Sequence, residues 1–357
     1  MKKNRNNKRT MSGEDKSSRR SGRDRQNMSH KVEGDISSDN TFADEYFVLQ
    51  SANEALEEGF NQPEPKDLWR KIWFENEILC LFSDSNLGKS ILAVQIAQEV
   101  AENEPVVYFD FELTTKQFQK RYTDANGVLH HFPDSLLRVR KQMNSRTWEK
   151  FDQNVIKGIE QTLLRSGARI AIIDNITFIS DKLEDGDAAM QLMRRFIFLK
   201  EKYHFSILIV AHTPKHFPYS PVTENDLSGS KKLYNSFDSV VAIGRSILGR
   251  GRRYLKTLKQ RNDEVCYDEH SVLCCHIEKT GSFLGFVFDG TCPEREHLAK
   301  PSRNNEQYVN DVMKLYGEGK STREIGELLN SNKSTVHRVI NEHKNDPKPS
   351  PYKDNDL

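Results

Sequence analysis

The most constraining stretch of this sequence covers residues 77–100. A short apolar run (78–82) is followed by a polar loop (83–87), by Gly-Lys-Ser at 88–90, and by a segment with helical apolar periodicity. A strand, a loop and a helix in this order form the setting of a Walker A phosphate loop. The first turn of a helix has unpaired backbone N–H groups and the positive end of the helix dipole, so it attracts phosphate.

The residue types in this loop predict how a nucleotide and Mg²⁺ would be held. Gly88 lets the backbone approach closely, Lys89 can neutralise β- and γ-phosphate oxygens, and Ser90 can hold Mg²⁺. The expected nucleotide-binding residues are Ser83, Asp84, Ser85, Asn86, Leu87, Gly88, Lys89 and Ser90. Ser83 departs from the pattern, which has glycine there, because serine reaches positive φ less freely. Asp and Asn in the loop tolerate left-handed conformations better than most residues. A chance Gly-Lys-Ser is the alternative, and the strand–loop–helix context argues against it.

Charge, hydropathy and cysteine usage narrow the class of protein. The formal net charge is +1, so the chain as a whole has no preference for polyanions. No apolar run reaches the roughly 18 residues of a membrane span, and the basic N-terminus lacks the apolar core of a secretory signal. The five cysteines are odd in number and none forms C-x-x-C. This pattern favours reduced thiols in the cytoplasm over disulfides or a zinc site.

Composition divides the chain into six segments. Only 36% of the residues are hydrophobic, which is low for a wholly compact protein. We predict a disordered basic tail (1–40), an acidic linker with room for one short helix (41–66), an α/β domain (67–295), a linker (296–305), a helical domain (306–344) and a tail (345–357). The basic tail is too poor in apolar residues to fold alone, and it is either an arm for nucleic acid or a solubilising segment.

The α/β domain is predicted from alternating patterns. Strands are expected at 78–82, 106–109, 137–140, 170–173, 207–211, 239–243, 254–259 and 272–277, and helices at 89–102, 115–126, 146–166 and 188–202. Alternating strands and helices imply a mostly parallel sheet with helices on both faces. The last strands follow one another without helices, so they are expected to be antiparallel.

Two carboxylates follow predicted strands. Asp174 ends the apolar run 170–173, where a central parallel strand would face the ligand crevice and could hold the Mg²⁺ water shell. A plain turn is the alternative. Glu112 follows the strand 106–109, and a carboxylate beside a γ-phosphate can accept a proton from attacking water. Glu112 could instead be a helix-start residue favoured by the dipole, and Asp110 is the competing base.

These motifs together resemble the RecA-like ATPase core, and are most similar to the RepA-type and DnaB-type hexameric replicative helicases. The resemblance covers about residues 70–285 and includes ILIVAHTPK (207–215) and LKQRND (258–263). It implies a RecA-like sheet, ATP and Mg²⁺ as cofactors, ATP hydrolysis, DNA as a partner, and a homo-oligomer for which a hexameric ring is one form. It also implies a role in replication or mobilisation of a plasmid or other mobile element.

The resemblance also assigns roles to single residues. His212 and Thr213 would sense the γ-phosphate, although His212 could instead be a hydrogen-bonded histidine at a strand end. Lys259 and Arg261 would reach the γ-phosphate of a neighbouring subunit, where a guanidinium stabilises developing negative charge. The alternative for this pair is a solvated face. A segment bordering the DNA-binding loop would supply phosphate contacts from Lys215, Lys231 and Lys232.

Residues 306–344 have the pattern of three short helices. The expected buried stripes are Val309, Val312, Met313 and Tyr316 in the first helix and Ile325, Leu328 and Leu329 in the second. Ser321 opens the second helix with a capping-box pattern, and Ser334 is expected to cap the third. A tight turn between the last two helices predicts a helix-turn-helix, similar to the DNA-binding modules of resolvase-type recombinases. The residues expected to face a major groove are Lys333, Thr335, His337 and Arg338. An oligomerisation or lid domain without DNA is the alternative.

The leading hypothesis is therefore a RecA-like ATPase that acts on DNA in a helicase-like manner. The alternative is a nucleotide-gated DNA-binding regulator or adaptor with little ATPase activity. The unusual Ser83 favours that alternative, as does a helix-turn-helix, which needs no motor. A small-molecule kinase is disfavoured because no lid or substrate-binding segment is apparent.

Overall fold

The structure is a computed structural model, and it describes residues 48–142, 151–179, 185–213, 216–227 and 231–344, with backbone only at 151–153 and 231. The predicted tails at 1–40 and 345–357 lie outside the described residues. The chain divides into two compact units, Met1–Pro63 and Glu64–Leu357. In the first unit, helix α2 (Ala52–Asn61) begins with a capping box made by Ser51 and Glu54, and none of its residues is buried. This is the short helix that was expected in the linker.

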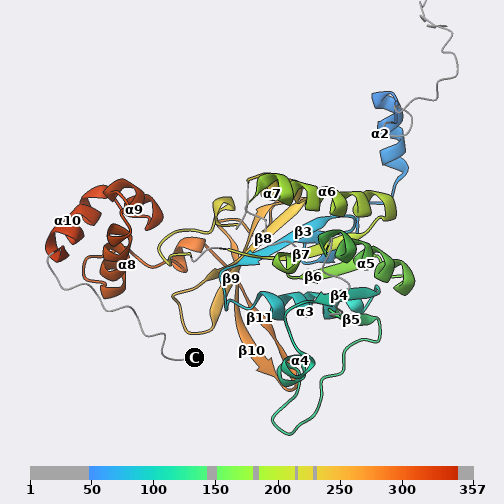
Figure 1. Ribbon diagram of the computed structural model, residues 1–357, viewed down its shortest axis with the longest axis horizontal. Helices are drawn as coiled ribbons and strands as arrows, with labels where there is room; N and C mark the ends of the chain where they lie inside the picture. Colours follow the sequence, from blue (N-terminus) through green and yellow to red (C-terminus); the bar gives the residue numbers. More distant parts are fainter. Residues whose placement is uncertain (1–47, 143–150, 180–184, 214–215, 228–230, 345–357) are drawn as a thin grey trace, which may run out of the picture. The chain divides into compact units, whose positions relative to one another are not determined.

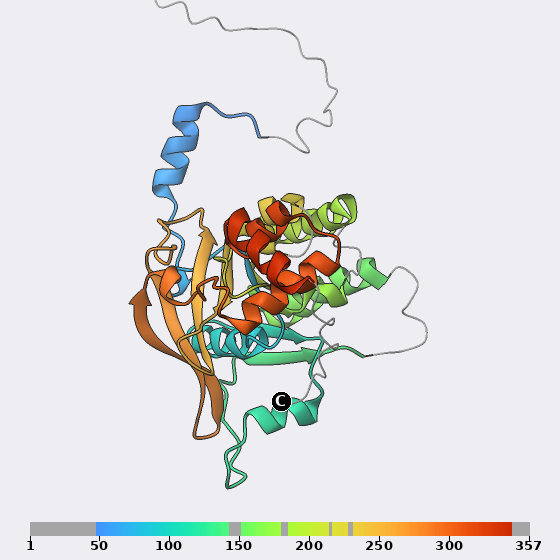
Figure 2. The same ribbon diagram turned by 90° about the vertical axis from the view of Figure 1, so that its left-hand side faces the viewer.

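The second unit is built on a nine-stranded sheet. Its strands are β3 (Ile78–Ser83), β4 (Val106–Asp110), β5 (Leu136–Arg140), β6 (Ile170–Asp174), β7 (Ser206–His212), β8 (Ser239–Arg245), β9 (Arg252–Lys259), β10 (Val272–Thr280) and β11 (Phe283–Cys292). Their order is β11-β10-β9-β8-β3-β7-β6-β4-β5 (Figure 1). Neighbouring strands from β8 to β5 run parallel, whereas β8 to β11 pair antiparallel. The predicted α/β fold with an antiparallel extension is confirmed, and Figure 2 shows β9–β11 in orange at one edge.

Both faces of the central strands are buried, which explains their continuous apolar runs. In β3, Ile78, Cys80 and Phe82 belong to one core, while Leu79 and Leu81 belong to the other. The helices are α3 (Lys89–Ala101), α4 (Thr115–Arg121), α5 (Phe151–Ser166), α6 (Gly186–Tyr203) and α7 (Lys231–Ser236). Apolar residues of α5, α6 and α7 fill the first core, and those of α3 fill the second together with a small sheet of β1 (Asp67–Trp69) and β2 (Trp73–Phe74). Figure 1 shows α6 and α7 on one side of the sheet and α3 on the other.

Helix α4 is shorter than the sequence predicted. It ends at Arg121 rather than continuing to residue 126, and Tyr122 leaves the helical region with φ −116° and ψ 44°. Beyond it, the Asp124 carboxylate accepts hydrogen bonds from the backbone N–H groups of Asn126 and Val128. An aspartate that bonds its own downstream backbone favours a turn over a continuing helix.

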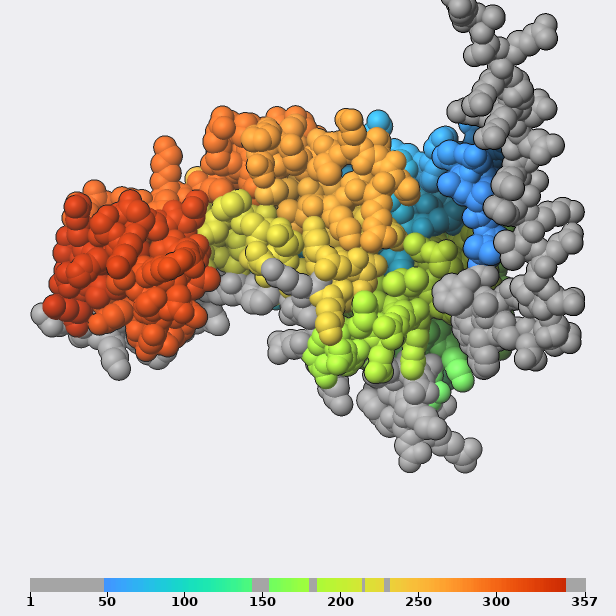
Figure 3. All heavy atoms as spheres, turned by 90° about the horizontal axis from the view of Figure 1, so that it is seen from above, coloured from blue at the N-terminus to red at the C-terminus, as the bar shows by residue number. Residues whose placement is uncertain are grey.

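Three helices form the C-terminal helical module: α8 (Glu306–Gly317), α9 (Thr322–Leu328) and α10 (Lys333–His343). Figure 3 draws their atoms in orange to red. The buried core of the module consists of Tyr308, Val312, Leu315, Ile325, Leu329, Val336, Val339 and Ile340. The prediction that Tyr316 and Leu328 are buried is wrong, because they are 46% and 39% exposed. The third helix is capped by Asn332, which accepts from the Thr335 N–H, and not by Ser334. The capping box at Ser321 is confirmed.

The loop after β7 packs into this module. The ring of Tyr219 meets the Tyr308 ring edge-on, with centroids 5.4 Å apart. The backbone carbonyl of Tyr219 accepts a hydrogen bond from Asn330 Nδ2 at 3.2 Å, and Ser220 Oγ donates to the Leu328 carbonyl at 2.8 Å. A loop that begins at the sheet therefore completes the core of the helical module.

No helix in the described part of the chain combines the length and apolarity needed to cross a membrane.

A buried ion pair fixes the segment between β11 and the module. Glu294 Oε2 accepts from Lys256 Nζ at 2.6 Å, and the two side chains are only 2% and 7% exposed. Glu294 Oε1 accepts from the Tyr254 hydroxyl and the Val222 N–H, both at 2.9 Å. The carboxylate is thus shared by a strand and a loop that are distant in sequence.

We predict that Glu294→Ala lowers the free energy of unfolding by about 3–5 kcal/mol, because it leaves the Lys256 ammonium buried without its counter-charge. Urea unfolding followed by circular dichroism measures the change. The matched control is Glu296→Ala, an exposed carboxylate two residues away, which should change stability by less than about 0.5 kcal/mol. Equal effects of the two substitutions would contradict the role given to Glu294.

Candidate active site

The phosphate loop has its left-handed residues at Asn86 (φ 63°) and Gly88 (φ 97°). Ser83 is instead the last residue of β3, 2% exposed and paired in parallel register with His212. Because Ser83 has strand geometry, this loop needs no glycine at its first position. The departure noted in the sequence is therefore accommodated by the backbone.

Gly88 is required by space as well as by its backbone angle. A Cβ atom there would lie 2.6 Å from Ile277 Cδ1 and 3.1 Å from Phe286 Cζ. Those side chains belong to the β10–β11 hairpin, which therefore packs directly on the loop. A larger residue would force the Ile277 and Phe286 side chains to shift, in addition to the strain of a positive φ.

Lys89 is buried at the base of the loop. Its Nζ donates to the carbonyl oxygens of Ser83 (2.8 Å) and Asp84 (3.0 Å). Burial lowers the pKa of Lys89, while the carboxylates of Asp174 and Glu112 oppose this change. These groups lie beside a cleft of about 350 Å³, whose lining includes Lys89, Ser90, Glu112, Arg121 and His212. Predicted residues from the start of α3, the loop after β4 and the end of β7 thus meet in one place, in a volume suited to a small ligand.

Asp174 has one oxygen left for a ligand. Its Oδ2 accepts from the Tyr108 hydroxyl at 2.6 Å, and its Oδ1 has no hydrogen-bond partner among the residues that the structure describes. Burial raises the pKa of Asp174 to about 6, although the hydroxyls of Tyr108 and Ser90 partly offset the effect. A buried, unpartnered carboxylate oxygen near a serine hydroxyl fits Mg²⁺, a hard cation that prefers oxygen ligands.

Glu112 is held by two polar side chains. Asn175 Nδ2 donates to Glu112 Oε1 and lies 3.0 Å from His212 Nε2, which is itself 3.4 Å from Glu112 Oε1. The hydrogen bond with His212 lowers the pKa of Glu112, and the charges of Lys89 and Arg121 act in the same direction. Glu112 is therefore kept ionised, as a proton acceptor must be.

Asn175 is the site residue that the sequence analysis missed. It directly follows Asp174 at the end of β6, and its position after a strand-end aspartate was the only available signal. His212 contacts both Asn175 and Glu112, so it is a hydrogen-bonded histidine at the end of β7 and it also borders the cleft.

Asp110, the competing base, is fully engaged elsewhere. It is 1% exposed, and its Oδ2 accepts from Arg138 Nε (2.9 Å) and Nη2 (2.6 Å). Its Oδ1 accepts from the N–H groups of Glu112 and Leu113. Asp110 therefore shapes the turn that presents Glu112 and has no oxygen available for water.

Lys259 and Arg261 lie far from this cleft. Lys259 Nζ donates to the Phe237 carbonyl at 2.6 Å, and Arg261 Nη1 pairs with Asp238 Oδ1 at 2.9 Å. Asp238 also accepts from the N–H of Ile78, the first residue of β3, whereas the phosphate loop follows its last residue. Lys259 and Arg261 thus lie at the opposite end of the strands from the phosphate loop, and they cannot reach the cleft of their own chain.

The predicted DNA contacts have mixed positions. Lys215 and the side chain of Lys231 lie outside the described residues, and Lys232 pairs with Asp187 Oδ1 at 2.8 Å on an exposed surface. In the helical module, Lys333, His337 and Arg338 are exposed on α10. Thr335 instead donates to Asn332 Oδ1 at 2.8 Å within the helix cap.

Comparison with known proteins agrees with a nucleotide site in this cleft. Residues 44–216 match the family model of an AAA domain, just under half of the chain. The matched range contains the phosphate loop, Glu112, Asp174 and His212. A search of curated proteins found no match. The matched domain and the mostly parallel sheet fit a RecA-like P-loop ATPase, which suggests binding and hydrolysis of a nucleotide.

We predict that Asp174→Asn stabilises the protein in EDTA, by about 3 kcal/mol at pH 7.5 and roughly half of that at pH 5. The folded-state pKa of about 6 lies above the ordinary value of 3.8. The protonated Asp174 side chain therefore makes its full contribution to the free energy of unfolding below about pH 3.8. This contribution is lost as the pH rises through about 6, where the buried carboxylate ionises. Asparagine removes that charge and keeps an oxygen for the Tyr108 hydroxyl.

Urea unfolding at the two pH values measures this effect. Asp134→Asn, at an exposed position, is the control and should show no pH-dependent gain. A gain from Asp174→Asn that is the same at pH 5 and pH 7.5 would sink the explanation.

Proposed function

We propose that this protein is a cytosolic RecA-like ATPase that hydrolyses ATP with Mg²⁺ and couples hydrolysis to work on DNA. One observation carries the proposal. Lys89 and Ser90 of the phosphate loop share a cleft with Glu112, a carboxylate held in place by Asn175 and His212.

Each of these residues has a defined task in hydrolysis. Backbone N–H groups at the start of α3 and the Lys89 ammonium bind the phosphates. Ser90 and Asp174 would hold Mg²⁺, which supplies neutralisation of phosphate charge when bound. Glu112 accepts the proton of the attacking water, and Asn175 and His212 orient its carboxylate.

The C-terminal helical module is proposed to bind DNA as a helix-turn-helix. Helix α10 presents exposed Lys333, His337 and Arg338, side chains that can contact phosphates and base edges. The turn before it is tight, because a Cβ on Gly326 would lie 2.7 Å from the Ser331 carbonyl oxygen. The resemblance to RepA-type helicases supports a role in replication or mobilisation of a plasmid or other mobile element.

The route from the cleft to the module is short along the chain. Strand β7 ends at His212, beside Glu112, and Tyr219 lies in the core of the module. A nucleotide that moves His212 would therefore act on the segment that Tyr219 anchors. This link also supports the alternative function, a DNA-binding regulator that responds to bound nucleotide without turning it over.

Assembly into an oligomer is proposed from the position of Arg261. Its guanidinium is at the opposite edge of the sheet from Lys89, and its side chain is 56% exposed. Another chain's cleft is therefore the one that Arg261 can complete. A ring, hexameric in the similar helicases, repeats such contacts around a closed symmetry.

We predict that ATP turnover is stimulated by single-stranded DNA in the wild-type protein. Lys89→Ala should lose nucleotide binding, because it removes the only loop ammonium. Glu112→Gln should keep binding and lose about 10²–10⁴-fold in turnover, because an amide cannot accept the proton. Phosphate release and binding of a fluorescent ATP analogue provide the two measurements.

The control for charge removal is Glu102→Gln, an exposed position at the end of α3 that should leave both measurements unchanged. ATP binding without turnover in the wild-type protein, with or without DNA, would reject the motor in favour of the regulator. Equal turnover in Glu112→Gln and wild type would reject Glu112 as the base.

We also predict that Arg261 acts on a neighbouring chain. Arg261→Ala alone should lower turnover by about 10³-fold or more, because a guanidinium at the transferred phosphate is lost. Mixing it with Lys89→Ala should restore part of the activity, since an intact cleft of one chain then meets an intact Arg261 of the other.

The matched control is a mixture of Lys89→Ala and Glu112→Gln. Both changes damage the same side of the interface, so this mixture should stay inactive. Failure of the Arg261→Ala and Lys89→Ala mixture, at concentrations where size-exclusion chromatography shows an oligomer, would overturn the proposed neighbour contact.

A further inference from the structure

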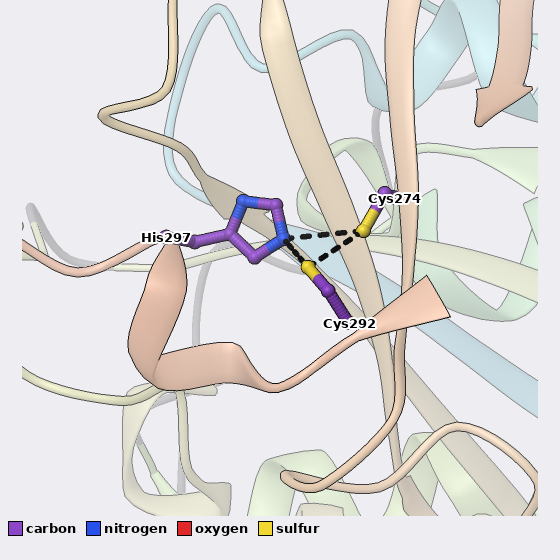
Figure 4. A group of neighbouring side chains, drawn as sticks. All are labelled: Cys274, Cys292 and His297. Carbon is purple, nitrogen blue, oxygen red and sulfur yellow. Dashed lines mark hydrogen bonds between the residues drawn. The ribbon is translucent and has the colours of Figure 1, made fainter. Parts of the chain in front are cut away.

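Three potential metal ligands meet away from the nucleotide cleft (Figure 4). Cys274 lies in β10, Cys292 ends β11, and His297 follows a short 3-10 helix at Glu294–Glu296. The two Sγ atoms are 2.9 Å apart, and His297 Nε2 lies 3.0 Å from Cys292 Sγ and 3.4 Å from Cys274 Sγ. All three ligand atoms face one another, and we call this group the Cys-Cys-His cluster.

The cysteine pattern alone argued against a zinc site, and the fold changes that reading. The spacing is C-x17-C-x4-H, which matches no short metal-binding motif. Antiparallel pairing of β10 with β11 brings the two cysteines together, and the register shifts between Leu273 and Cys275. Strand pairing of this kind cannot be seen in the cysteine spacing.

His297 is positioned as a metal ligand by the groups around it. The residue is 2% exposed, and its ring stacks on Tyr254 with centroids 4.7 Å apart. Its Nδ1 is 2.7 Å from Ser246 Oγ. When Nδ1–H donates to that hydroxyl, the lone pair of Nε2 points at the two sulfurs, which is the tautomer and orientation that a metal requires.

We propose that the Cys-Cys-His cluster binds one Zn²⁺ through Cys274 Sγ, Cys292 Sγ and His297 Nε2. Soft sulfur and imidazole ligands select zinc over Mg²⁺ and Ca²⁺. Each thiol loses its proton as its sulfur bonds the metal, so binding of one Zn²⁺ releases two protons. The charges of the ion and the two thiolates then cancel, and water takes the fourth position.

The geometry requires only side-chain adjustment. Zinc–sulfur bonds of about 2.3 Å in a tetrahedral site place two sulfurs about 3.8 Å apart. The two sulfur atoms, now 2.9 Å apart, would therefore move apart by about 1 Å. Rotation of the cysteine side chains about χ1 can supply this movement. The same proximity makes a disulfide the competing chemistry, because an oxidised pair has no thiolate to offer.

The position of the cluster indicates what the metal would do. The His297 carbonyl accepts from the Ile247 N–H in the β8–β9 turn, and two residues later the Ala299 N–H donates to the Pro218 carbonyl. Zinc would therefore tie the end of the β10–β11 hairpin to the segment that enters the C-terminal helical module. Its expected effect is on stability of this junction and not on the phosphate chemistry.

The test uses the full-length protein, reduced and stripped of metal. We expect Co²⁺ to bind with one equivalent per chain and to produce a thiolate-to-cobalt charge-transfer band with tetrahedral d–d bands. Zn²⁺ should displace the cobalt and raise the melting temperature. Cys274→Ser, Cys292→Ser and His297→Gln should each weaken Zn²⁺ binding by at least about 100-fold in competition with a chromophoric chelator.

Two further variants separate metal binding from folding. Cys266→Ser removes an exposed thiol outside the cluster and should leave affinity unchanged. Ser246→Ala keeps all three ligands and should weaken binding by about 10–100-fold at unchanged stoichiometry. Absence of the charge-transfer band in the reduced wild-type protein would overturn the proposal, as would equal affinity of wild type and Cys292→Ser. If the protein is isolated with a Cys274–Cys292 disulfide and still binds no metal after that disulfide has been reduced, the proposal is also overturned. These readouts do not depend on ATP turnover, so their outcome is independent of the proposed function.

Discussion

The parallel register of the central strands is the constraint on which the site depends. Ser83 pairs with His212, and Asp110 pairs with Asp174, so the functional ends of the strands lie at one edge of the sheet. This register is fixed because both faces are buried, and a slip by one residue would move every side chain to the other core. The loops that follow the strands inherit that alignment, and a cleft forms where they meet.

The sequence was sufficient for the parallel strands, the phosphate loop and most of the cleft, because those features are local. It missed β11 and the small sheet of β1 and β2. Apolar runs such as 170–173 mark buried strands, and the polar residue that ends each run is the one that faces a ligand. It was insufficient where partners are distant. The engagement of Asp110 by Arg138 and the Cys-Cys-His cluster depend on strand pairing, which spacing does not reveal. In α8, helical periodicity tolerated two neighbouring stripes, and packing selected the one with Tyr308 and Leu315 over the one with Tyr316.

Charges in the cleft are not balanced by the protein alone. Burial lowers the pKa of Lys89 and raises that of Asp174 to about 6, so each is held in surroundings that oppose its charged form. A phosphate beside the ammonium and a divalent cation beside the carboxylate would relieve both penalties. Local conflicts of this kind are expected at functional sites, where stability is exchanged for affinity. Tyr108 fits the same argument, because its hydroxyl satisfies one oxygen of Asp174 and leaves the other for a ligand.

The β10–β11 hairpin connects the two sites that the structure supports. One part of it packs on the phosphate loop, where the side chains of Ile277 and Phe286 lie against Gly88. Gln95 of α3 fastens that part, because its Oε1 accepts from the Phe286 N–H and its Nε2 donates to the Phe286 carbonyl. The opposite end of the hairpin carries Cys274 and Cys292 beside the segment that leads to the C-terminal helical module. A paired hairpin is stiff along its strands, so a tie at the cysteine end limits how far the other end can move from Gly88. One element, an antiparallel extension of an otherwise parallel sheet, thus packs on the phosphate loop and lies beside the segment that leads to the helical module.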